Sequence, residues 1–339
     1  MAPIIQIRGL TKVYVQDFVG VEHGRLKIRF KDRRRVALEN LDLDVSEGEI
    51  FGLLGPNGAG KTTTLKILMG LHFATRGTAT IMGKPLGDLA VKERIGFLPE
   101  NPYFYDYLTG IEFLDYYGQL YGMDKAKRRK RIPELLDKVG LTHAGELPLR
   151  GYSKGMLQRA GLAQSLLNDP QIVFLDEPQS GLDPFGRKEV RDLILSLRDA
   201  GKTVFFSSHI LQDAEVICDR VAILHKGERI ALGPLSEMLS AKVKEYEVTF
   251  SNAGDALQNK AKQSARRYVV QRNEYLAVFD KEDAARGLAS EILAGGATLN
   301  SFVARKETLE EYFIREIEGK RRQEREGGST ANSREEARK

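Results

Sequence analysis

The sequence predicts an α/β protein whose core is a mostly parallel sheet, followed by a smaller α+β domain. Two continuous apolar runs, at 172–175 and 203–206, are typical of buried strands and are separated by a helical stretch at 186–200. Such strand–helix–strand units form parallel sheets that are covered on both faces. A third apolar strand, at 50–54, runs into a glycine-rich loop and a helix. A change of composition near Gly233 indicates where the first domain ends.

The glycine-rich loop after the strand at 50–54 fits the pattern G-x-x-x-x-G-K-[ST], which cradles nucleotide phosphates. Glycines let the backbone approach the anion closely, so that N–H groups and the helix N-terminus face the phosphates. Lys61 supplies a positive charge for the outer phosphates, and the Thr62 hydroxyl can bind Mg²⁺. The residues predicted to bind nucleotide here are Gly55, Pro56, Asn57, Gly58, Ala59, Gly60, Lys61, Thr62 and Thr63.

Length and composition restrict the class of protein. With 339 residues, 42% of them hydrophobic, the chain can form two domains with a sizeable core. Cys218 is the one cysteine, which excludes an intrachain disulfide and a cysteine metal cluster and fits a reducing compartment. No apolar run is long enough to span a bilayer, and the first residues do not resemble a signal peptide. A net charge of +5 is compatible with an anionic membrane face or nucleic acid and establishes neither.

In the N-terminal region, apolar residues alternate with polar ones around residues 5–7 and 41–45, which predicts half-exposed strands. Between them lie residues 16–35, in which apolar and basic side chains alternate over 26–31, and this predicts a short hairpin with one basic edge. Lysine and arginine on an edge strand protect it from aggregation. The same edge could instead contact lipid headgroups or a partner, and both interpretations stay open.

Residues 99–160 predict a mostly helical subdomain. Ile132, Leu135 and Val139 recur at helical spacing and give one apolar face. The basic run at 127–131 is interpreted as the solvated start of this helix rather than as a nucleic-acid patch, because no aromatic platform for base stacking interleaves with it.

Two carboxylates follow the buried strand at 172–175. Asp176 stands at the strand end, where a carboxylate can hold Mg²⁺ through water, and Glu177 can polarise an attacking water molecule. The alternative is a strand that ends in ordinary surface acids. Because a phosphate loop with Lys61 precedes the pair and further motifs surround it, we predict a site for nucleotide hydrolysis.

A segment before this strand carries a resemblance to a known family. In Tyr152-Ser153-Lys154-Gly155-Met156, the serine and the glycine match the signature L-S-G-G-Q of the ATP-binding subunits of ABC transporters. A serine hydroxyl and a glycine N–H at a helix start can bind a γ-phosphate. In the family, that phosphate belongs to ATP held by the opposite subunit, so the resemblance implies that Ser153 and Gly155 face a partner's nucleotide. The other three residues depart from the signature, and Lys154 adds a charge.

Four more residues stand at positions that the family uses. The segment 180–184 resembles the loop that contacts the partner subunit, which implies a nucleotide contact for Asp183. His209 resembles the switch histidine that hydrogen-bonds the γ-phosphate. Tyr14 lies where the family stacks an aromatic ring on adenine, although it could also be an ordinary strand-end tyrosine. Glu100 lies where most members have glutamine; it can reach Mg²⁺ or the water but, when ionised, only accepts hydrogen bonds.

The resemblance covers residues 4–233, and we expect a P-loop ABC ATPase domain over 1–240 with a mostly parallel sheet, an antiparallel β subdomain and the helical subdomain. A C-terminal α+β domain over 241–318 is similar to the accessory domain of some drug- and antibiotic-export ATPases. The tail, 319–339, is charged and poor in apolar residues, which predicts disorder. The elements predicted in the accessory domain are strands around 246–250 and 275–279, a helix over 283–293 and a final helix capped by Thr308 and Glu311.

The resemblance implies an ATP-hydrolysing subunit of an ABC transporter, of the export type, with ATP and Mg²⁺ as cofactors. It implies a separate transmembrane permease, a second ATPase subunit, identical or different, and a place in the cytoplasm on the inner face of the cell membrane. No nucleic-acid partner is expected. The aromatic stretch 103–107 is the predicted docking surface for the permease, with some of it in the core.

Two other classes of protein compete with this interpretation. One is a soluble ABC-type ATPase of DNA repair or translation, which would carry long heptads or two cassettes; this chain has neither. The other is a regulatory nucleotide-binding module without hydrolysis, against which Glu177 and His209 argue.

Overall fold

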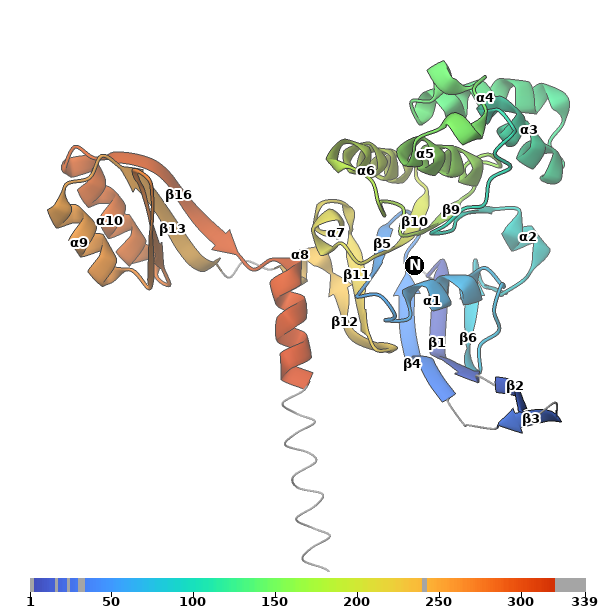
Figure 1. The fold of residues 1–339 in the computed structure, drawn as a ribbon, viewed down its shortest axis with the longest axis horizontal. Coiled ribbons are helices and arrows are strands. Elements are labelled where there is room, and N and C mark those ends of the chain that lie inside the picture. The colour runs from blue at the N-terminus through green and yellow to red at the C-terminus, as the bar shows by residue number, and fades with distance from the viewer. Residues whose placement is uncertain (1–2, 16–17, 23–24, 30–33, 240–242, 321–339) are drawn as a thin grey trace, which may run out of the picture. The chain divides into compact units, whose positions relative to one another are not determined.

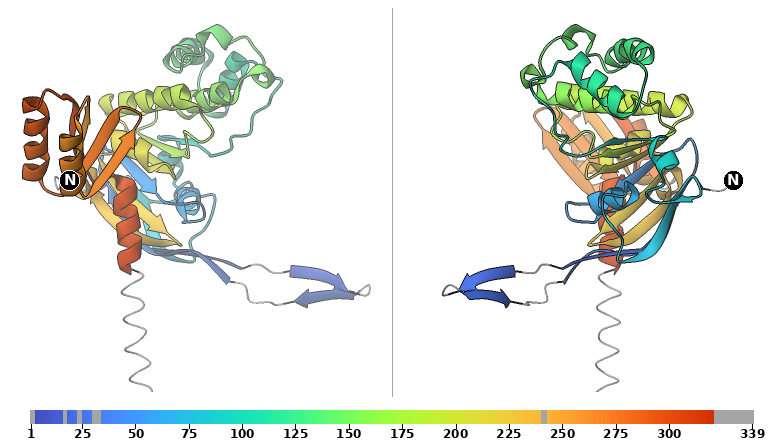
Figure 2. Two further views of the ribbon diagram at one scale, coloured as in Figure 1. Left: turned by 60° about the vertical axis from the view of Figure 1, so that its left-hand side comes forward. Right: turned by 90° about the vertical axis from the view of Figure 1, so that its right-hand side faces the viewer.

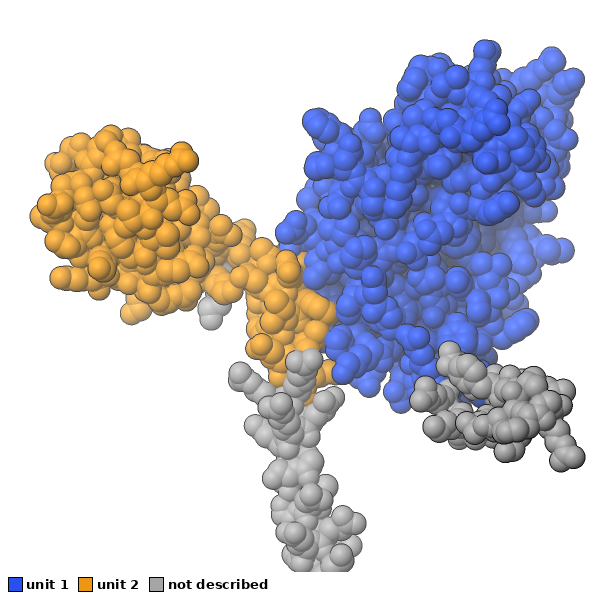
Figure 3. All heavy atoms as spheres, viewed as in Figure 1, with its two compact units in different colours: residues 1–235 blue, residues 236–339 orange. Residues whose placement is uncertain are grey.

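The computed structural model describes residues 3–15, 18–22, 25–29, 34–239 and 243–320. The chain divides into two compact units, residues 1–235 and 236–339 (Figure 3). Residues 309–320 form a helix, so helical structure continues two residues past 318. The rest of the tail for which we predict disorder lies outside the described residues. Among the described helices, none combines the length and the apolar character needed to cross a membrane.

The central sheet of unit 1 has six strands in the order β12-β11-β5-β10-β9-β8 (Figure 1). Strands β11, β5, β10, β9 and β8 are parallel, whereas β12 pairs antiparallel with β11. Strands β5, β9 and β10 are buried along their whole length, which confirms the parallel sheet predicted from their apolar sequences. The bounds are β5 Ile50–Leu54, β8 Ile95–Leu98, β9 Ile172–Asp176, β10 Thr203–Ser208, β11 Arg220–His225 and β12 Glu228–Pro234.

A second sheet of unit 1 is antiparallel, with the order β4-β1-β6-β7. The strands predicted around 5–7 and 41–45 are parts of β1 and β4, and Ile5 pairs with Val45. Strands β2 and β3 form the hairpin predicted within 16–35; its basic edge lies outside the residues whose side chains are described. The bounds are β1 Ile5–Val15, β2 Phe18–Glu22, β3 Arg25–Arg29, β4 Arg34–Val45, β6 Arg76–Ile81 and β7 Lys84–Pro85.

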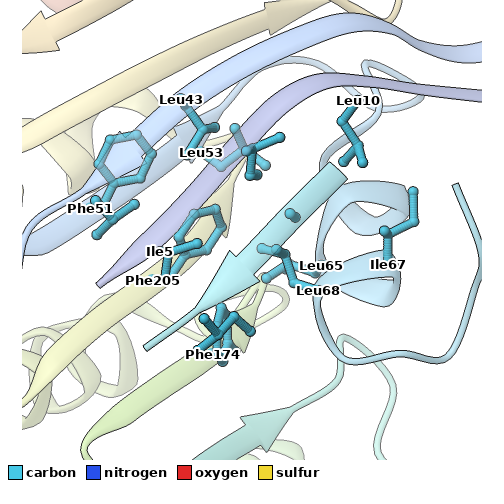
Figure 4. Close-up of a cluster of buried hydrophobic side chains, with 14 of the residues drawn as sticks. Ile5, Leu10, Leu43, Phe51, Leu53, Leu65, Ile67, Leu68, Phe174 and Phe205 are labelled. Carbon is cyan, nitrogen blue, oxygen red and sulfur yellow. The ribbon is translucent and has the colours of Figure 1, made fainter. Parts of the chain in front are cut away.

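The core of unit 1 joins these two sheets to helix α1, Lys61–Leu68 (Figure 4). Ile5 and Leu43 come from the antiparallel sheet, Phe51 and Phe205 from the central sheet, and Leu65 from α1. These five side chains are at most 2% exposed. Burial of apolar area on this scale stabilises the fold by about 25 cal/mol per Å² and fixes the start of α1 against the carboxyl edge of the central sheet.

Helices α3, α4 and α5 form the helical part of unit 1 and gather on one side of it (Figure 2). Helix α4 buries Ile132 and Leu135, as predicted from their spacing. The basic run at 127–131 lies within the helix, and Arg128 in it forms an ion pair with Asp115 at 2.6 Å. The helix bounds in unit 1 beyond α1 are α2 Leu89–Lys92, α3 Gly110–Leu120, α4 Lys125–Lys138, α5 Lys154–Ser165, α6 Pro184–Asp199 and α7 Leu211–Ile217.

The second unit begins within helix α8, Leu235–Met238, and continues in the order β-α-β-β-α-β. Its antiparallel sheet has the strand order β14-β15-β13-β16, which is a ferredoxin-like arrangement. Helices α9 and α10 cover one face, where Val248, Phe250 and Ile292 are fully buried. The capping box predicted for Thr308 and Glu311 is present. The bounds are β13 Val243–Ser251, α9 Asp255–Ser264, β14 Arg267–Gln271, β15 Glu274–Phe279, α10 Glu282–Ala294 and β16 Thr298–Lys306.

Candidate functional site

The phosphate loop lies between β5 and α1, at the carboxyl edge of the central sheet. Gly60, immediately before α1, has φ +111°, and a Cβ atom there would lie 2.6 Å from the carbonyl oxygen of Ala37. Only glycine fits this combination of left-handed backbone and close packing. The Gly55 N–H bonds the carbonyl of Ser208 at 3.2 Å, which ties the start of the loop to the end of β10. The loop therefore has a defined shape, with the N-terminus of α1 behind it.

Lys61 is the cation of this loop, and its side chain is only 5% exposed. Its ammonium donates to the carbonyl oxygen of Gly55 at 2.8 Å and to that of Pro56 at 3.3 Å. The Nζ atom also lies 3.0 Å from Glu177 Oε1, an ion-pair distance without the angles of a hydrogen bond. The lysine therefore links the phosphate loop to the end of β9.

The register of the sheet brings the ends of three strands to this loop. Ser207 on β10 stands beside Asp176 on β9 and beside Leu53 on β5. The Ser207 hydroxyl donates to Asp176 Oδ1 at 2.6 Å and accepts from the N–H of Glu177 at 3.0 Å. Serine at this position thus fixes both carboxylate residues that follow the apolar run.

Asp176 and Thr62 form the oxygen-rich part of the site. The Thr62 hydroxyl donates to Asp176 Oδ1 at 3.2 Å. Burial raises the pKa of the Asp176 carboxyl, while the hydrogen bonds from Ser207 and Thr62 act in the opposite direction. Hydroxyl and carboxylate oxygens are ligands that Mg²⁺ accepts, usually with substrate phosphates completing its shell. Among the described residues, no group of three or more histidine, cysteine, aspartate or glutamate side chains could hold a metal by itself, so the residues fit a Mg²⁺ ion that arrives with phosphates.

Glu177 and His209 form a pair beside the phosphate loop. Glu177 Oε2 lies 2.7 Å from His209 Nδ1 and accepts from the His209 backbone N–H at 3.2 Å. Glu177 has φ +50°, a left-handed conformation that is rare outside glycine, asparagine and aspartate. Such backbone strain persists where the surrounding structure imposes it, and here it aims the carboxylate at Lys61 and His209 together.

A cavity of about 450 Å³ opens above the phosphate loop. It brings together Tyr14 from β1, Glu100 from the segment after β8, and Glu177, as the sequence predicts. Asp176 and His209 do not line it, but they contact Thr62 and Glu177, which do. The residues that line the cavity are Tyr14, Val15, Arg35, Ala37, Asn57, Gly58, Gly60, Lys61, Thr62, Thr63, Glu100 and Glu177.

Ser153, Gly155 and Asp183 lie away from this cavity lining. The Ser153 hydroxyl caps α5 by accepting from the N–H of Met156 at 3.2 Å, and the Asp183 carboxylate caps α6 by accepting from Gly186 at 2.7 Å. Both residues are exposed. Each therefore has a structural role in its own helix, and a role toward nucleotide requires a second molecule.

Sequence reasoning missed Arg35, Val15 and Ala37 as lining residues. Arg35 stands only at the end of a basic run in the sequence, but it pairs directly with Tyr14 across strands β1 and β4. Aligning the two predicted strands as an antiparallel pair, starting from Tyr14, would have identified Arg35. Three register shifts between Ile7 and Val13 hide that pairing from simple alternation.

A second hollow, of about 530 Å³, lies between α4, α5 and α6, with Lys138, Arg159 and Glu189 in its lining. It has no glycine-rich loop, and its basic groups are partly neutralised by neighbours such as the Arg159–Glu189 pair at 3.4 Å. Phosphate binding needs the backbone N–H groups and the lysine of the first cavity. We therefore assign the nucleotide to the phosphate-loop cavity.

The fold and this cavity define a P-loop nucleotide-hydrolysing protein. A family model described as ABC transporter matches residues 38–180. An uncharacterized ABC transporter ATP-binding protein of Synechocystis is 48% identical over 83% of this chain and 78% of its own length. The Nod factor export ATP-binding protein I of Cupriavidus metallidurans is 34% identical over 72% of this chain and 75% of its own length.

A solved structure described as the ATP binding subunit of an ABC transporter has a TM-score of 0.57 and 30% identity, and the match covers 69% of this chain and 91% of that chain. Together with the sequence relatives, it shows that this chain belongs to the ATP-binding subunits of ABC transporters. The ABC ATPase fold and the ATPase activity predicted from the motifs are confirmed. The DNA-repair, translation and regulatory alternatives are not favoured by these relatives.

Proposed function

We propose that this chain binds Mg²⁺ and ATP in the phosphate-loop cavity and that hydrolysis there drives export through a separate membrane permease. The observation that carries the proposal is the continuous line of contacts from Lys61 through Glu177 to His209. Export is supported by similarity to a protein whose name states export. In this proposal, Lys61 binds the nucleotide phosphates, Glu177 acts in hydrolysis and His209 responds to the γ-phosphate.

The phosphate loop and α1 would hold the nucleotide. Tyr14 would stack on the base, and the residues from Gly55 to Thr63 would surround the phosphates. The phosphates would attract Lys61, in competition with its ion pair to Glu177. Mg²⁺ would be held by Thr62, by Asp176 through water, and by Glu100, and it would neutralise charge that develops on the phosphates.

Glu177 would polarise the attacking water. Its carboxylate is 5% exposed, and its position is fixed by His209 and by the backbone bond to Ser207. His209 could bridge Glu177 and the γ-phosphate, because both nitrogens of a protonated imidazole are donors. The histidine would then relay the presence of the γ-phosphate to α7.

Ser153, Gly155 and Asp183 would act on the nucleotide of a second ATPase subunit. The two helix starts that carry them are exposed and lie outside the cavity of their own chain. Helix N-termini attract phosphate oxygens. ATP would therefore join two subunits head to tail, and its hydrolysis would release them.

Mixing two inactive variants tests this sharing. Lys61→Ala removes the phosphate cation, and Ser153→Arg blocks the junction. In a mixed dimer, one composite site carries both lesions and the other carries neither. Recovery of ATP hydrolysis in the mixture, with neither variant active alone, supports the head-to-tail arrangement. A mixture as inactive as its components argues against sharing.

The permease would dock on an aromatic surface made of Tyr103, Tyr105, Tyr107 and Tyr116. Tyr103 is 83% exposed and Tyr107 is 66% exposed, whereas Phe104 beside them packs against Phe113 at 5.3 Å between ring centroids. Exposed tyrosines in one cluster are typical of protein interfaces. This docking would place the chain in the cytoplasm, on the inner face of the membrane.

Co-expression with a candidate permease tests the transport proposal. We expect the chain to sediment with membranes only when the permease is present, and ATP hydrolysis to change when the two are together. Tyr107→Ser should release the chain from membranes while leaving its ATP affinity unchanged; Tyr312→Ser, in the second unit, is the matched control. Membrane binding that survives changes at all four tyrosines would overturn the docking surface.

A further inference from the structure

Arg35 lines the phosphate-loop cavity and stands directly opposite Tyr14 in the pairing of two strands. The two residues are partners in the antiparallel pairing of β1 and β4. Side chains of directly opposite residues project from the same face of a sheet. Both residues line the cavity, so the guanidinium and the phenol ring lie at the same end of the nucleotide site.

The Arg35 side chain reaches the phosphate loop itself. A Cβ atom placed on Gly58 would lie 3.4 Å from Arg35 Nη2. Gly58 has φ +78° and sits in the middle of the loop, three residues before Lys61. The guanidinium therefore lies beside the part of the backbone that would face the phosphates.

The charges of the cavity lining leave Arg35 available to an anion. The lining holds two cations, Lys61 and Arg35, and two carboxylates, Glu100 and Glu177. Lys61 is paired with Glu177 at 3.0 Å. Within the described part of the chain, no ion pair joins Arg35 to a carboxylate. Arg35 therefore offers a polyphosphate in the cavity a positive charge that no described carboxylate neutralises.

We propose that Arg35 is a second phosphate-binding cation of this chain and that it contacts the polyphosphate of bound ATP or ADP from the side of β4. The inference rests on the proposed nucleotide site and extends it by one residue. Guanidinium offers a fork of N–H donors that fits phosphate oxygens in pairs. Arg35 would thus add a second cation to Lys61 in the lining of the cavity.

Titration of the full chain with Mg²⁺-ATP tests the role of Arg35. We expect Arg35→Gln to weaken ATP binding about tenfold at low ionic strength, which is within the usual range for a charged hydrogen bond. The loss should shrink in about 1 M KCl, because salt screens exposed charges. Arg35→Lys should recover most of the affinity. Arg34→Gln is the matched control, because Arg34 neighbours Arg35 on β4 but is not in the cavity lining, and it should bind ATP like the parent.

Three outcomes would overturn the inference. The first is parent-like ATP affinity in Arg35→Gln. The second is a loss that is the same at low and high salt, which indicates stacking on the base or a packing role. The third is an equal loss in Arg34→Gln, which indicates a general effect of charge. Lys61→Ala distinguishes failure of the proposed nucleotide site from failure of the Arg35 proposal. If Lys61→Ala also binds ATP like the parent, the phosphate-loop site itself is wrong. If Lys61→Ala binds ATP weakly while Arg35→Gln binds like the parent, only the role of Arg35 is wrong.

Discussion

At the residue scale, the buried position of Asp176 and its proposed role in binding Mg²⁺ favour opposite charge states of its carboxyl. Its side chain is 1% exposed, and burial raises the pKa of its carboxyl. The nearby carboxylates of Glu100 and Glu177 act in the same direction. The proposed binding of Mg²⁺ requires the charged form, which the buried position disfavours.

Asp176→Asn should separate these two contributions. The amide oxygen can still accept from Ser207, but no charge is buried, so we expect the melting temperature at pH 8 to rise by a few degrees, as about 1 kcal/mol would give for a domain of this size. A raised folded-state pKa means that the parent loses stability as the pH rises from the usual carboxyl pKa through the raised value. The gain in melting temperature of Asp176→Asn over the parent should therefore vanish at acidic pH, where the parent carboxyl is protonated in both the folded and the unfolded state.

The same variant should need more Mg²⁺ for half-maximal hydrolysis, by about 10–100-fold, as is usual when a residue that holds a metal through water is lost. Thermal unfolding at pH 5 and pH 8 and a Mg²⁺ titration of the ATPase rate measure the two effects. A melting temperature that falls equally at both pH values would contradict the account of the buried charge.

At the element scale, the residues at the starts of α5 and α6 that we propose to contact a second subunit also cap their own helices. Ser153 caps α5, and its hydroxyl accepts from Met156. Beside it, Lys154 crosses to the loop before α6, where a Cβ on Gly181 would collide with the lysine side chain. The Lys154 side chain therefore lies against this loop, so the two helix starts that carry the proposed contact with a second subunit are close to each other within one chain.

Ser153→Arg and Ser153→Ala distinguish the loss of the Ser153 hydroxyl from a steric block of the junction with the second subunit. Both lose the capping hydroxyl, which costs about 1 kcal/mol, but only arginine fills the junction. We expect near-normal ATP affinity of the monomer in both variants and loss of ATP-driven dimerisation and hydrolysis with arginine. Size-exclusion chromatography with ATP measures the dimer. An equal loss of dimerisation in the two variants would show that the missing hydroxyl, and not the arginine in the junction, accounts for it.

Much of the site follows from sequence because it is local. The loop from Gly55 to Thr63 and the carboxylates after β9 adjoin continuous apolar strands, whose period and turn residues identify them. Strand β6 was not predicted because its first three residues are exposed, so its sequence lacks the continuous apolar run of the central strands. Arg35 escaped because the pairing of β1 with β4 shifts register several times. Long-range pairing of this kind depends on tertiary contacts that no local pattern contains.

The second unit shows the same limit. Alternation at 246–250 and 275–279 predicts β13 and β15, which are indeed strands. Their order in the sheet places β13 between β15 and β16, a strand that begins 47 residues after β13 ends. The sequence therefore predicts an α+β domain. The ferredoxin-like strand order depends on the pairing of β13 with both β15 and β16, which are distant in sequence.

At the scale of the whole molecule, the nucleotide site is contained in unit 1. Apart from Glu177, every residue that lines the phosphate-loop cavity precedes Asn101, and Asp176, Glu177 and His209 all precede residue 235. The second unit has its own buried core around Val248. Each unit therefore has the packing that an independent fold requires.

Ending the chain at residue 240 should leave a folded ATP-binding protein. We expect ATP affinity within about twofold of the parent, because no lining residue is removed, and weaker dimerisation or coupling to the permease. A nucleotide titration and a thermal melt of the shortened chain measure this. A soluble, folded product that does not bind ATP would show that the second unit completes the site.

The central claim is that this chain hydrolyses ATP in the phosphate-loop cavity with Glu177 beside the attacking water. The most direct measurement is phosphate release by Glu177→Gln, compared with the parent and with Glu189→Gln, an exposed acid on α6. The account predicts intact ATP binding and hydrolysis slowed by about 10²–10⁴-fold, the usual contribution of a positioned base, with Glu189→Gln like the parent. Hydrolysis by Glu177→Gln at the parent rate would contradict it.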